Sequence, residues 1–246
     1  MSTPQQYIPV TFARPWRIRR PYLYRYLEKE HVNRFFNEGI LRISSFAAFG
    51  KHPDEERMDD KEGSGVVMHT NSEGTGQTIM ARIDQGSNAY ILCGATAFSE
   101  ELKDAFARDS GFRINDTTSF ADAVAHHIPG FRGGVEGSCL YLDNRTVSRN
   151  LGHIDLDQFK SQPNSSNLDM GKLGGLLQTI ADDDLCFTKP LKYAHQNEYR
   201  LIWFVPANVA GHIDIRCPEA ANFCTRFEEL FSEHHQVSLN KTTPPA

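Results

Sequence analysis

Residues 198–205 read Glu198-Tyr199-Arg200-Leu201-Ile202-Trp203-Phe204-Val205 and give the clearest strand signal in the second half of the chain. β-Branched and aromatic residues dominate the run, as is typical of strands. Residues 90–98 form another apolar run, and a continuous rather than alternating pattern is typical of a strand buried on both faces. We therefore expect residues 90–98 to lie at the centre of a sheet, and we expect residues 210–216 to pair with residues 198–205.

The remaining pattern predicts short strands and helices mixed along the chain. Strands are expected at residues 21–27, 40–46, 65–70 and 77–83. Helices are expected at residues 28–39, 100–108, 119–127, 155–160, 172–181 and 219–233. There is no regular strand–helix–strand rhythm, so the sequence predicts an α+β fold, a single domain with a mostly antiparallel mixed sheet and flanking helices.

Composition indicates one folded domain between two polar ends. The chain has 246 residues, 39% of them hydrophobic, and no long linker divides it. We expect a basic arm at residues 1–20, a single α+β domain of catalytic type at residues 21–235, and a disordered tail at residues 236–246. The sequence contains neither a secretory signal nor a membrane-spanning run, and its five cysteines form no Cys-x-x-Cys pair. These features favour a cytoplasmic protein with no membrane partner and no structural zinc.

Charge is distributed unevenly along the chain. The net charge is −5, so no global field attracts nucleic acid. Residues 1–27, however, contain five arginines and no acid. Arginine forks bind phosphate and carboxylate groups with two parallel hydrogen bonds, which predicts a local anion site near the N-terminus. A solvated basic arm that pairs with the acidic remainder of the chain is an equal alternative.

The common catalytic fingerprints are absent. The sequence has no Gly-x-Gly-x-x-Gly turn, no P-loop, no His-Glu-x-x-His pair and no Gly-x-Ser-x-Gly elbow. Residues 52–62 are rich in acids, which are the oxygen ligands that Mg²⁺ and Ca²⁺ prefer. Their spacing is not that of a calcium loop, and charge runs are usually solvated, so we predict no metal. We expect residues 57–63 to be a mobile loop over a site, with Arg57 as a phosphate contact.

The order of three short segments along the chain suggests a functional hypothesis. They are Tyr24-Arg25-Tyr26, Ser44-Ser45-Phe46, and Tyr193-Ala194-His195-Gln196-Asn197-Glu198-Tyr199-Arg200-Leu201-Ile202. In this order they resemble the signature of ADP-ribosyltransferases: an arginine on one strand, a serine-rich strand end, and a glutamate preceded two residues earlier by Gln or Glu. The resemblance implies an ADP-ribosyltransferase-like fold and an NAD-dependent ADP-ribosyltransferase or NAD glycohydrolase.

The same segments resemble a large family of uncharacterised bacterial proteins. Its members open with Tyr-x-Tyr-Arg, continue to a strand ending in Ser-Ser-x-x-Phe, and close with Tyr-x-x-x-x-Glu-aromatic-Arg-Leu; here these are residues 22–26, 42–49 and 193–201. The chain departs from the family at residues 50–54, where Asn-Asp-Pro is usual. The gap from Ser45 to Glu198 is also far longer than in compact ADP-ribosylating toxins. This second resemblance implies a role in bacterial toxin or phage-defence biology.

The ADP-ribosyltransferase resemblance implies roles for single residues. Glu198 is implied as catalytic, with Gln196 orienting the nucleophile or acceptor from the same side of an extended chain. The implied NAD-binding residues are Tyr24, Arg25, Ser44, Ser45, Arg57 and Tyr193. Cleavage of NAD passes through an oxocarbenium-like state that a fixed carboxylate stabilises, while an arginine fork holds the pyrophosphate. The acceptor of ADP-ribose, a protein or a nucleic acid, stays open.

The sequence allows two other interpretations. In the structural one, Arg25 pairs with an acid across a sheet, and Glu198 and Arg200 form an ordinary cross-strand charge pair. In the other, the chain is a non-enzymatic binding module. Its segment Arg14-Pro15-Trp16-Arg17-Ile18-Arg19-Arg20 then contacts nucleic acid or an acidic protein.

Overall fold

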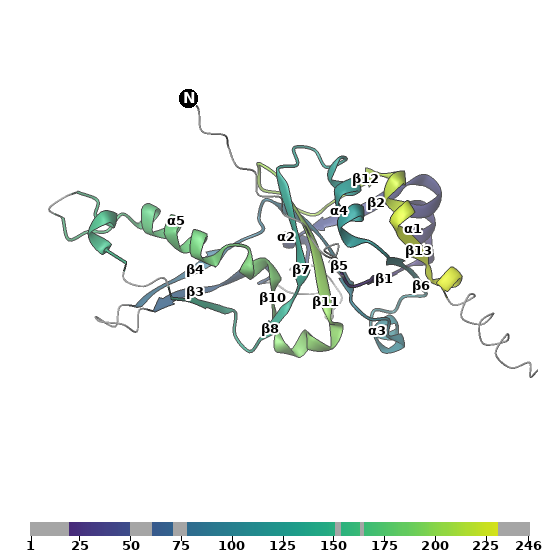
Figure 1. Cartoon of the computed structure of the whole chain (residues 1–246), viewed down its shortest axis with the longest axis horizontal. Coiled ribbons are helices and arrows are strands. Elements are labelled where there is room, and N and C mark those ends of the chain that lie inside the picture. Colours follow the sequence, from purple (N-terminus) through teal and green to yellow (C-terminus); the bar gives the residue numbers. More distant parts are fainter. Residues whose placement is uncertain (1–19, 50–60, 71–77, 151–153, 163–164, 231–246) are drawn as a thin grey trace, which may run out of the picture.

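A computed structural model of the chain describes residues 20–49, 61–70, 78–150, 154–162 and 165–230. At its centre is an eight-stranded sheet in which every neighbouring pair is antiparallel (Figure 1). Its strands are β1 (Leu23–Leu27), β2 (Ile40–Ser45), β5 (Ala89–Ala95), β6 (Ser110–Ile114), β7 (Gly133–Ser138), β11 (Glu198–Phe204), β12 (His212–Arg216) and β13 (Cys224–Arg226).

Short helical segments surround the sheet. They are α1 (Lys29–Asn33), the π-helical turn η1 (Arg34–Glu38), α2 (Phe46–Phe49), α3 (Glu100–Ala105), α4 (Thr117–Ala125), and the 3-10 turns η3 (Asp184–Phe187), η4 (Leu191–Gln196) and η5 (Pro218–Phe223). The segments α1, η1, α4 and η5 pack on one face and build the largest apolar cluster. Side chains of β11 alternate between the two faces: Leu201 and Trp203 enter this cluster, whereas Ile202 packs with Phe46 and Cys186 on the other face.

The strand β5 is the hub of the sheet because it pairs with three strands. One edge pairs with β11 along its whole length, from Ala95 opposite Glu198 to Ala89 opposite Phe204. On the other edge, β2 pairs only at Tyr90 and Ile91, and β1 pairs only at Ala95. The sheet therefore forks beside β5: β1 leads on to β6 and β13, and β2 leads on to β12.

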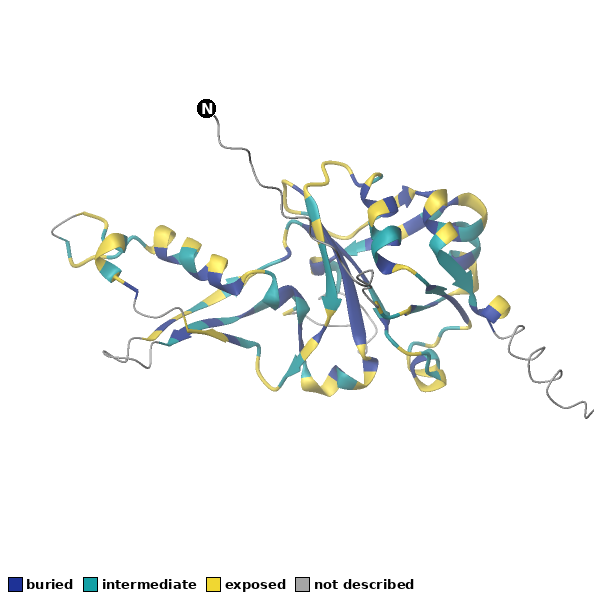
Figure 2. Cartoon of the chain, in the orientation of Figure 1, coloured by how far each residue is buried: buried dark blue, intermediate teal, exposed yellow. Residues whose placement is uncertain are grey.

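A smaller unit, the lobe, extends from the main sheet (Figure 1). In it, β3 (Ser64–Thr70) pairs antiparallel with β4 (Thr78–Asp84) and parallel with β9 (Thr146–Arg149), and α5 (Met170–Ala181) packs on these strands. Figure 2 shows that α5 is exposed along its outer side and buried toward the strands. The lobe has its own apolar cluster, which includes Val67, Leu173 and Leu177 and is separate from the clusters of the main sheet. Between the lobe and the main sheet lies a short parallel pair, β8 (Leu140–Leu142) and β10 (Thr188–Pro190).

The predicted α+β class and the mostly antiparallel sheet are confirmed. Residues 198–205 contain β11, and the central strand β5 covers residues 89–95, so it overlaps the predicted range 90–98 and ends three residues earlier. The helix predicted at residues 28–39 is α1 followed by η1, and it ends at Gly39, whose φ of 72° gives the left-handed cap that glycine favours. The helix predicted at residues 155–160 is the 3-10 turn η2 (Leu156–Phe159).

Two predictions about elements are wrong and two strands were not predicted, in each case because pairing with a distant strand decides the outcome. Residues 212–216 pair with β2 and not with β11, since β5 and β7 already occupy both edges of β11. Residues 219–233 are not one helix: η5 covers the first residues, and 224–226 become β13 on the edge of β6. The strands β6 and β7 were not predicted, because β7 is rich in glycine and both strands are stabilised by pairing with distant strands.

Some predictions fall outside the described residues. These are the basic arm except Arg20, the acidic segment up to residue 60 with Arg57, and the tail at residues 236–246. Within the part of the chain that the structure covers, no helix combines the length and the apolar character needed to cross a membrane.

Candidate functional site

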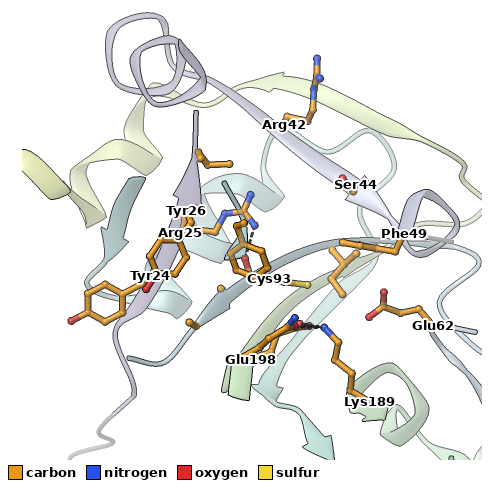
Figure 3. A pocket seen from close by; sticks show the side chains of 16 residues that line it. Tyr24, Arg25, Tyr26, Arg42, Ser44, Phe49, Glu62, Cys93, Lys189 and Glu198 are labelled. Carbon is orange, nitrogen blue, oxygen red and sulfur yellow. Dashed lines mark hydrogen bonds and ion pairs between the residues drawn. The ribbon is translucent and has the colours of Figure 1, made fainter. Parts of the chain in front are cut away.

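A cavity of about 170 Å³ lies in the fork of the main sheet (Figure 3). The wall beside β5 includes Ile91, Cys93 and Gly94, and the two diverging strands contribute Arg25 and Ser44. A sheet that stayed closed would fill this space with strand pairing. The fork instead leaves side chains from β1, β2, β5 and β11 around one hollow.

Glu198 is the first residue of β11 and lines the cavity. The residue before it, Asn197, has a left-handed backbone with φ of 43° and turns the chain from η4 into the strand. The Glu198 backbone N–H donates to the Tyr141 hydroxyl at 2.7 Å, which fixes the strand start. The residue as a whole is only 7% exposed, so its carboxylate is nearly dry.

Two cations hold the Glu198 carboxylate. The Nε of Arg200 donates to Oε1 at 2.6 Å, and the Nζ of Lys189 donates to Oε2. The Sγ of Cys139 lies 3.6 Å from Oε1 and donates to it as well. Charge-assisted hydrogen bonds of this kind fix both the rotamer and the ionisation of a buried acid. Glu198 is therefore an immobile anion at the cavity wall.

The two cations are themselves held. Lys189 also donates from Nζ to Gln196 Oε1 at 2.7 Å, and it lies over the Tyr193 ring with Nζ 4.9 Å from the centroid. Arg200 is fully buried and donates to the Cys186 carbonyl and to the Glu62 carboxylate. Two anions thus balance two cations in one buried quartet, formed by Glu62, Lys189, Glu198 and Arg200.

The pKa directions follow from this quartet. Burial alone raises the pKa of Glu198, but Arg200 and Lys189 outweigh it and lower that pKa below its ordinary value. Burial likewise opposes the charge of Arg200 and of Lys189, and their carboxylate partners outweigh it and raise both pKa values. Burial raises the pKa of Cys186 to about 12, and it raises the pKa of Cys93 and Cys139 too, so these thiols stay protonated. The anionic groups at the cavity wall are therefore carboxylates and not thiolates.

Arg25 projects from β1 into the fork, as Figure 3 shows. Its Nη1 donates to the Cys93 carbonyl at 2.5 Å. A side chain of β1 thereby takes the place of a strand partner for β5 where the sheet has opened. Tyr24 also lines the cavity, and its ring makes an edge contact with Phe98 at 5.9 Å between centroids.

The structure brings five of the predicted site residues to one cavity: Tyr24, Arg25, Ser44, Gln196 and Glu198. The prediction that Gln196 and Glu198 lie on one side of an extended chain is wrong, because Gln196 is the last residue of the 3-10 turn η4.

Two other predicted residues lie elsewhere. Ser45 is buried and is not among the cavity-lining residues, because successive residues of a strand point to opposite faces. Tyr193 lies outside the cavity lining, and the ammonium groups of Lys189 and Lys192 lie over its ring, with Nζ 4.9 Å and 4.6 Å from the centroid. The predicted contact Arg57 lies outside the described residues.

The sequence interpretation missed Lys189 and Glu62, which form ion pairs with Glu198 and Arg200. It also did not predict that Arg200 is buried and donates to Glu198. Glu62 is 138 positions from Arg200 in the chain, so no local pattern links them. Lys189 is closer, at nine positions before Glu198, but a lysine on a short strand gives no sign that it is buried. Within the described residues, no group of three or more His, Cys, Asp or Glu side chains is placed to hold a metal ion.

Comparison with known proteins gives no relative from which to transfer a function. No protein-family model, no curated protein and no solved structure matches this chain.

Proposed function

We propose that the chain cleaves the bond between nicotinamide and ribose in NAD and transfers ADP-ribose to an acceptor or to water. One observation carries the proposal: a buried, ionised and immobile carboxylate, Glu198, lines the same cavity as the guanidinium of Arg25. NAD offers a matching pair of features, a ribose that becomes positive in the transition state and a negative pyrophosphate. The toxin or phage-defence role implied by the family resemblance remains part of this proposal.

The reaction requires stabilisation of a cation. The bond between the ribose C1′ and the nicotinamide nitrogen breaks, its electron pair passes to the nicotinamide ring, and positive charge develops on C1′ and the ring oxygen of ribose. A preorganised anion in a water-poor site stabilises such charge without reorganisation. The nucleophile of the acceptor then adds to C1′ and loses its proton.

Glu198 retains capacity for such a ligand. An ionised carboxylate offers about four acceptor positions. Three described donors point at Glu198, namely Arg200, Lys189 and Cys139. We assign the remaining position to a ribose hydroxyl, as expected for a catalytic glutamate that orients the sugar while it stabilises the cation.

The other cavity residues complete the assignment. Arg25 contacts a phosphate of NAD, because its fork geometry suits phosphate oxygens. Ser44 and Tyr24 border the ligand, and Gln196 acts through Lys189, from which its Oε1 accepts a hydrogen bond. Gln196 is therefore a positioning residue in this proposal.

The binding-module alternative depends on the arginine-rich segment at residues 14–20, of which the structure describes only Arg20. That residue forms an ion pair with Glu136 at 3.0 Å. No observation on the described residues favours this alternative over the cavity.

The test is NAD consumption by the purified full chain, with and without cell lysate. We expect Glu198→Gln to abolish nicotinamide release, because the amide keeps the shape but not the charge. Glu136→Gln is the matched control, since Glu136 also pairs with an arginine but lies on β7 away from the cavity. Circular dichroism checks that both variants fold. Equal NAD consumption by folded Glu198→Gln and the parent contradicts the proposal, as does the absence of any nicotinamide release by the parent.

A further inference from the structure

A second cavity, of about 260 Å³, adjoins the site. It lies between β1, the α1–η1 segment and β2, and shares four lining residues with the Glu198 cavity: Arg25, Leu27, Arg42 and Ser44. We call it the basic groove. Because they share these residues, the two cavities lie side by side along the fork of the sheet, and we refer to the pair as the cleft.

The basic groove carries an excess of guanidinium groups. Arg25, Arg34, Arg42 and Arg108 line it together with His31, and Glu28 is the one acid among its lining residues in the described chain. This concentration of arginine contrasts with the net charge of −5 of the whole protein.

Two carboxylates of the described chain orient three of these arginines, Arg34, Arg42 and Arg108. Asp214 on β12 accepts from Arg42 Nε at 2.7 Å and Nη2 at 3.0 Å, and Arg34 Nη1 lies 3.6 Å from the same group. Glu28 accepts from Arg108. Arg42 lowers the pKa of Asp214, so that acid stays ionised and continues to hold the forks. Among the described residues, the guanidinium groups of Arg34, Arg42 and Arg108 therefore share two carboxylates.

Size also links the groove to the site. The Glu198 cavity, at about 170 Å³, is smaller than the roughly 300–1,000 Å³ usual for ligand pockets, whereas the two cavities together reach that range. Two other cavities of the described chain, one beside α4 and one beside α5, share no lining residue with the Glu198 cavity. A ligand of dinucleotide size that reaches Glu198 thus has room to extend into the basic groove.

We propose that the basic groove is a phosphate-binding site, built by Arg34, Arg42 and Arg108 and joined at Arg25 to the Glu198 cavity. The ligand chemistry is a diphosphate or phosphodiester, supplied either by a dinucleotide or by a nucleic-acid strand. Binding of phosphate here follows from the arginines alone. Placement of the attached sugar at Glu198 rests on the proposed function.

The test measures equilibrium binding to the full chain of three probes: inorganic pyrophosphate, ADP-ribose and a short single-stranded oligothymidylate. We expect Arg34→Gln and Arg108→Gln each to weaken binding about tenfold, because each removes one charged fork. Arg34→Lys keeps the charge but not the fork and is expected to bind with intermediate strength. Arg82→Gln is the control, since Arg82 is exposed on β4 of the lobe and lies 3.9 Å from its partner Asp84. Melting temperatures verify that each variant is folded.

The outcomes separate the two sources and also separate this inference from the proposed function. Groove-dependent binding of pyrophosphate and ADP-ribose supports the site with a dinucleotide as its ligand. Tighter, salt-sensitive binding of the oligonucleotide that also depends on the groove supports the site with a nucleic-acid strand as its ligand. Failure of all three probes to bind, or equal binding by parent and groove variants, overturns the inference. The same measurements on Glu198→Gln, which leaves the groove intact, are expected to give parental binding of pyrophosphate even if the protein does not consume NAD.

Discussion

Glu198 and Arg200 are two residues apart on β11 and point to the same face, which brings a carboxylate and a guanidinium together in the dry centre of the protein. Their attraction alone does not explain why they are buried, because taking two charges out of water costs several kcal/mol per ion. Glu62 and Lys189 complete a neutral quartet, and hydrogen bonds connect its four members. The arrangement is therefore costly to build, and removal of one partner is costly as well.

Arg200→Met tests the quartet directly. We expect the free energy of unfolding to fall by roughly 3–5 kcal/mol, because the change leaves Glu62 and Glu198 buried with one cation between them. Arg200 is fully buried, so water cannot replace the lost hydrogen bonds. Chemical denaturation measures the effect, with Arg132→Met as the control at an exposed arginine. A loss below about 1 kcal/mol, the value typical of surface ion pairs, contradicts the account.

The same quartet predicts a pH dependence. The pKa of Glu198 is lower in the folded chain than its ordinary value of 4.5. An acid whose pKa is lower in the folded state than in the unfolded state stabilises the fold. This contribution is complete above the pKa of the unfolded state and is lost as the pH falls toward the pKa of the folded state. We therefore expect the parent to lose more stability than Glu198→Gln as the pH falls below 4.5. Denaturation at a series of pH values measures this difference, and parallel curves for the two proteins refute it.

Single residues also define how far sequence reasoning reaches. Tyr24, Arg25, Ser44, Gln196 and Glu198 were identified from short motifs, and all five line one cavity. The counterion Glu62 was not identified, because its contact with Arg200 exists only after the chain has folded. Ser45 was predicted to bind the ligand because it is adjacent to Ser44 in the same motif. Side chains alternate along a strand, however, so the two serines lie on opposite faces.

At the scale of elements, the fork between β1 and β2 creates the cleft. Local pattern predicted both strands, and Gly39 marked the helix end between them. The local pattern did not predict that both strands pair with the same edge of β5 at different positions. The register between strands that are distant in sequence cannot be read from the residues of one strand alone. The same limitation explains the wrong helix at residues 219–233, where pairing of β13 with β6 overrides helical spacing.

Gly111→Ala tests the β1 branch of the fork. Gly111 on β6 lies opposite Tyr26, and an added Cβ would stand 2.1 Å from the Arg25 carbonyl oxygen and 2.4 Å from the Phe227 ring. Moving either neighbour away is energetically costly, since one is a backbone atom and the other belongs to a buried ring. We expect a loss of roughly 1–3 kcal/mol in the free energy of unfolding, as for other overpacked cores. Because β1 must shift, we also expect weaker pyrophosphate binding.

Gly175→Ala provides the matched control for that prediction. Gly175 is exposed within α5, and nothing lies within 4 Å of an added Cβ. Alanine favours a helix over glycine by roughly 0.8–1 kcal/mol, so this change is expected to stabilise the protein. Opposite signs for the two glycine variants, measured by the same denaturation experiment, support the packing argument. Destabilisation of equal size in both would contradict it.

At the scale of the whole molecule, the site lies where the lobe meets the main sheet. Glu62 stands just before β3 of the lobe, while Arg200 and Glu198 belong to β11. Because the lobe has its own apolar cluster, it can unfold locally while the main sheet stays folded. The Glu62–Arg200 pair is thus a link through which the lobe affects the carboxylate at the cavity.

Leu177→Ala tests this link. Leu177 is 2% exposed in the lobe cluster, and its truncation is expected to cost roughly 2–5 kcal/mol of local stability. Amide hydrogen exchange should then become faster in β3, β4 and α5 and stay slow in β5 and β11. Because a loosened lobe no longer holds Glu62 against Arg200, we expect slower NAD consumption with pyrophosphate binding unchanged. Leu201→Ala in the main cluster is the comparison and should speed exchange in β5 and β11. Uniform acceleration across the chain in Leu177→Ala would instead show that the lobe and the main sheet unfold as one unit.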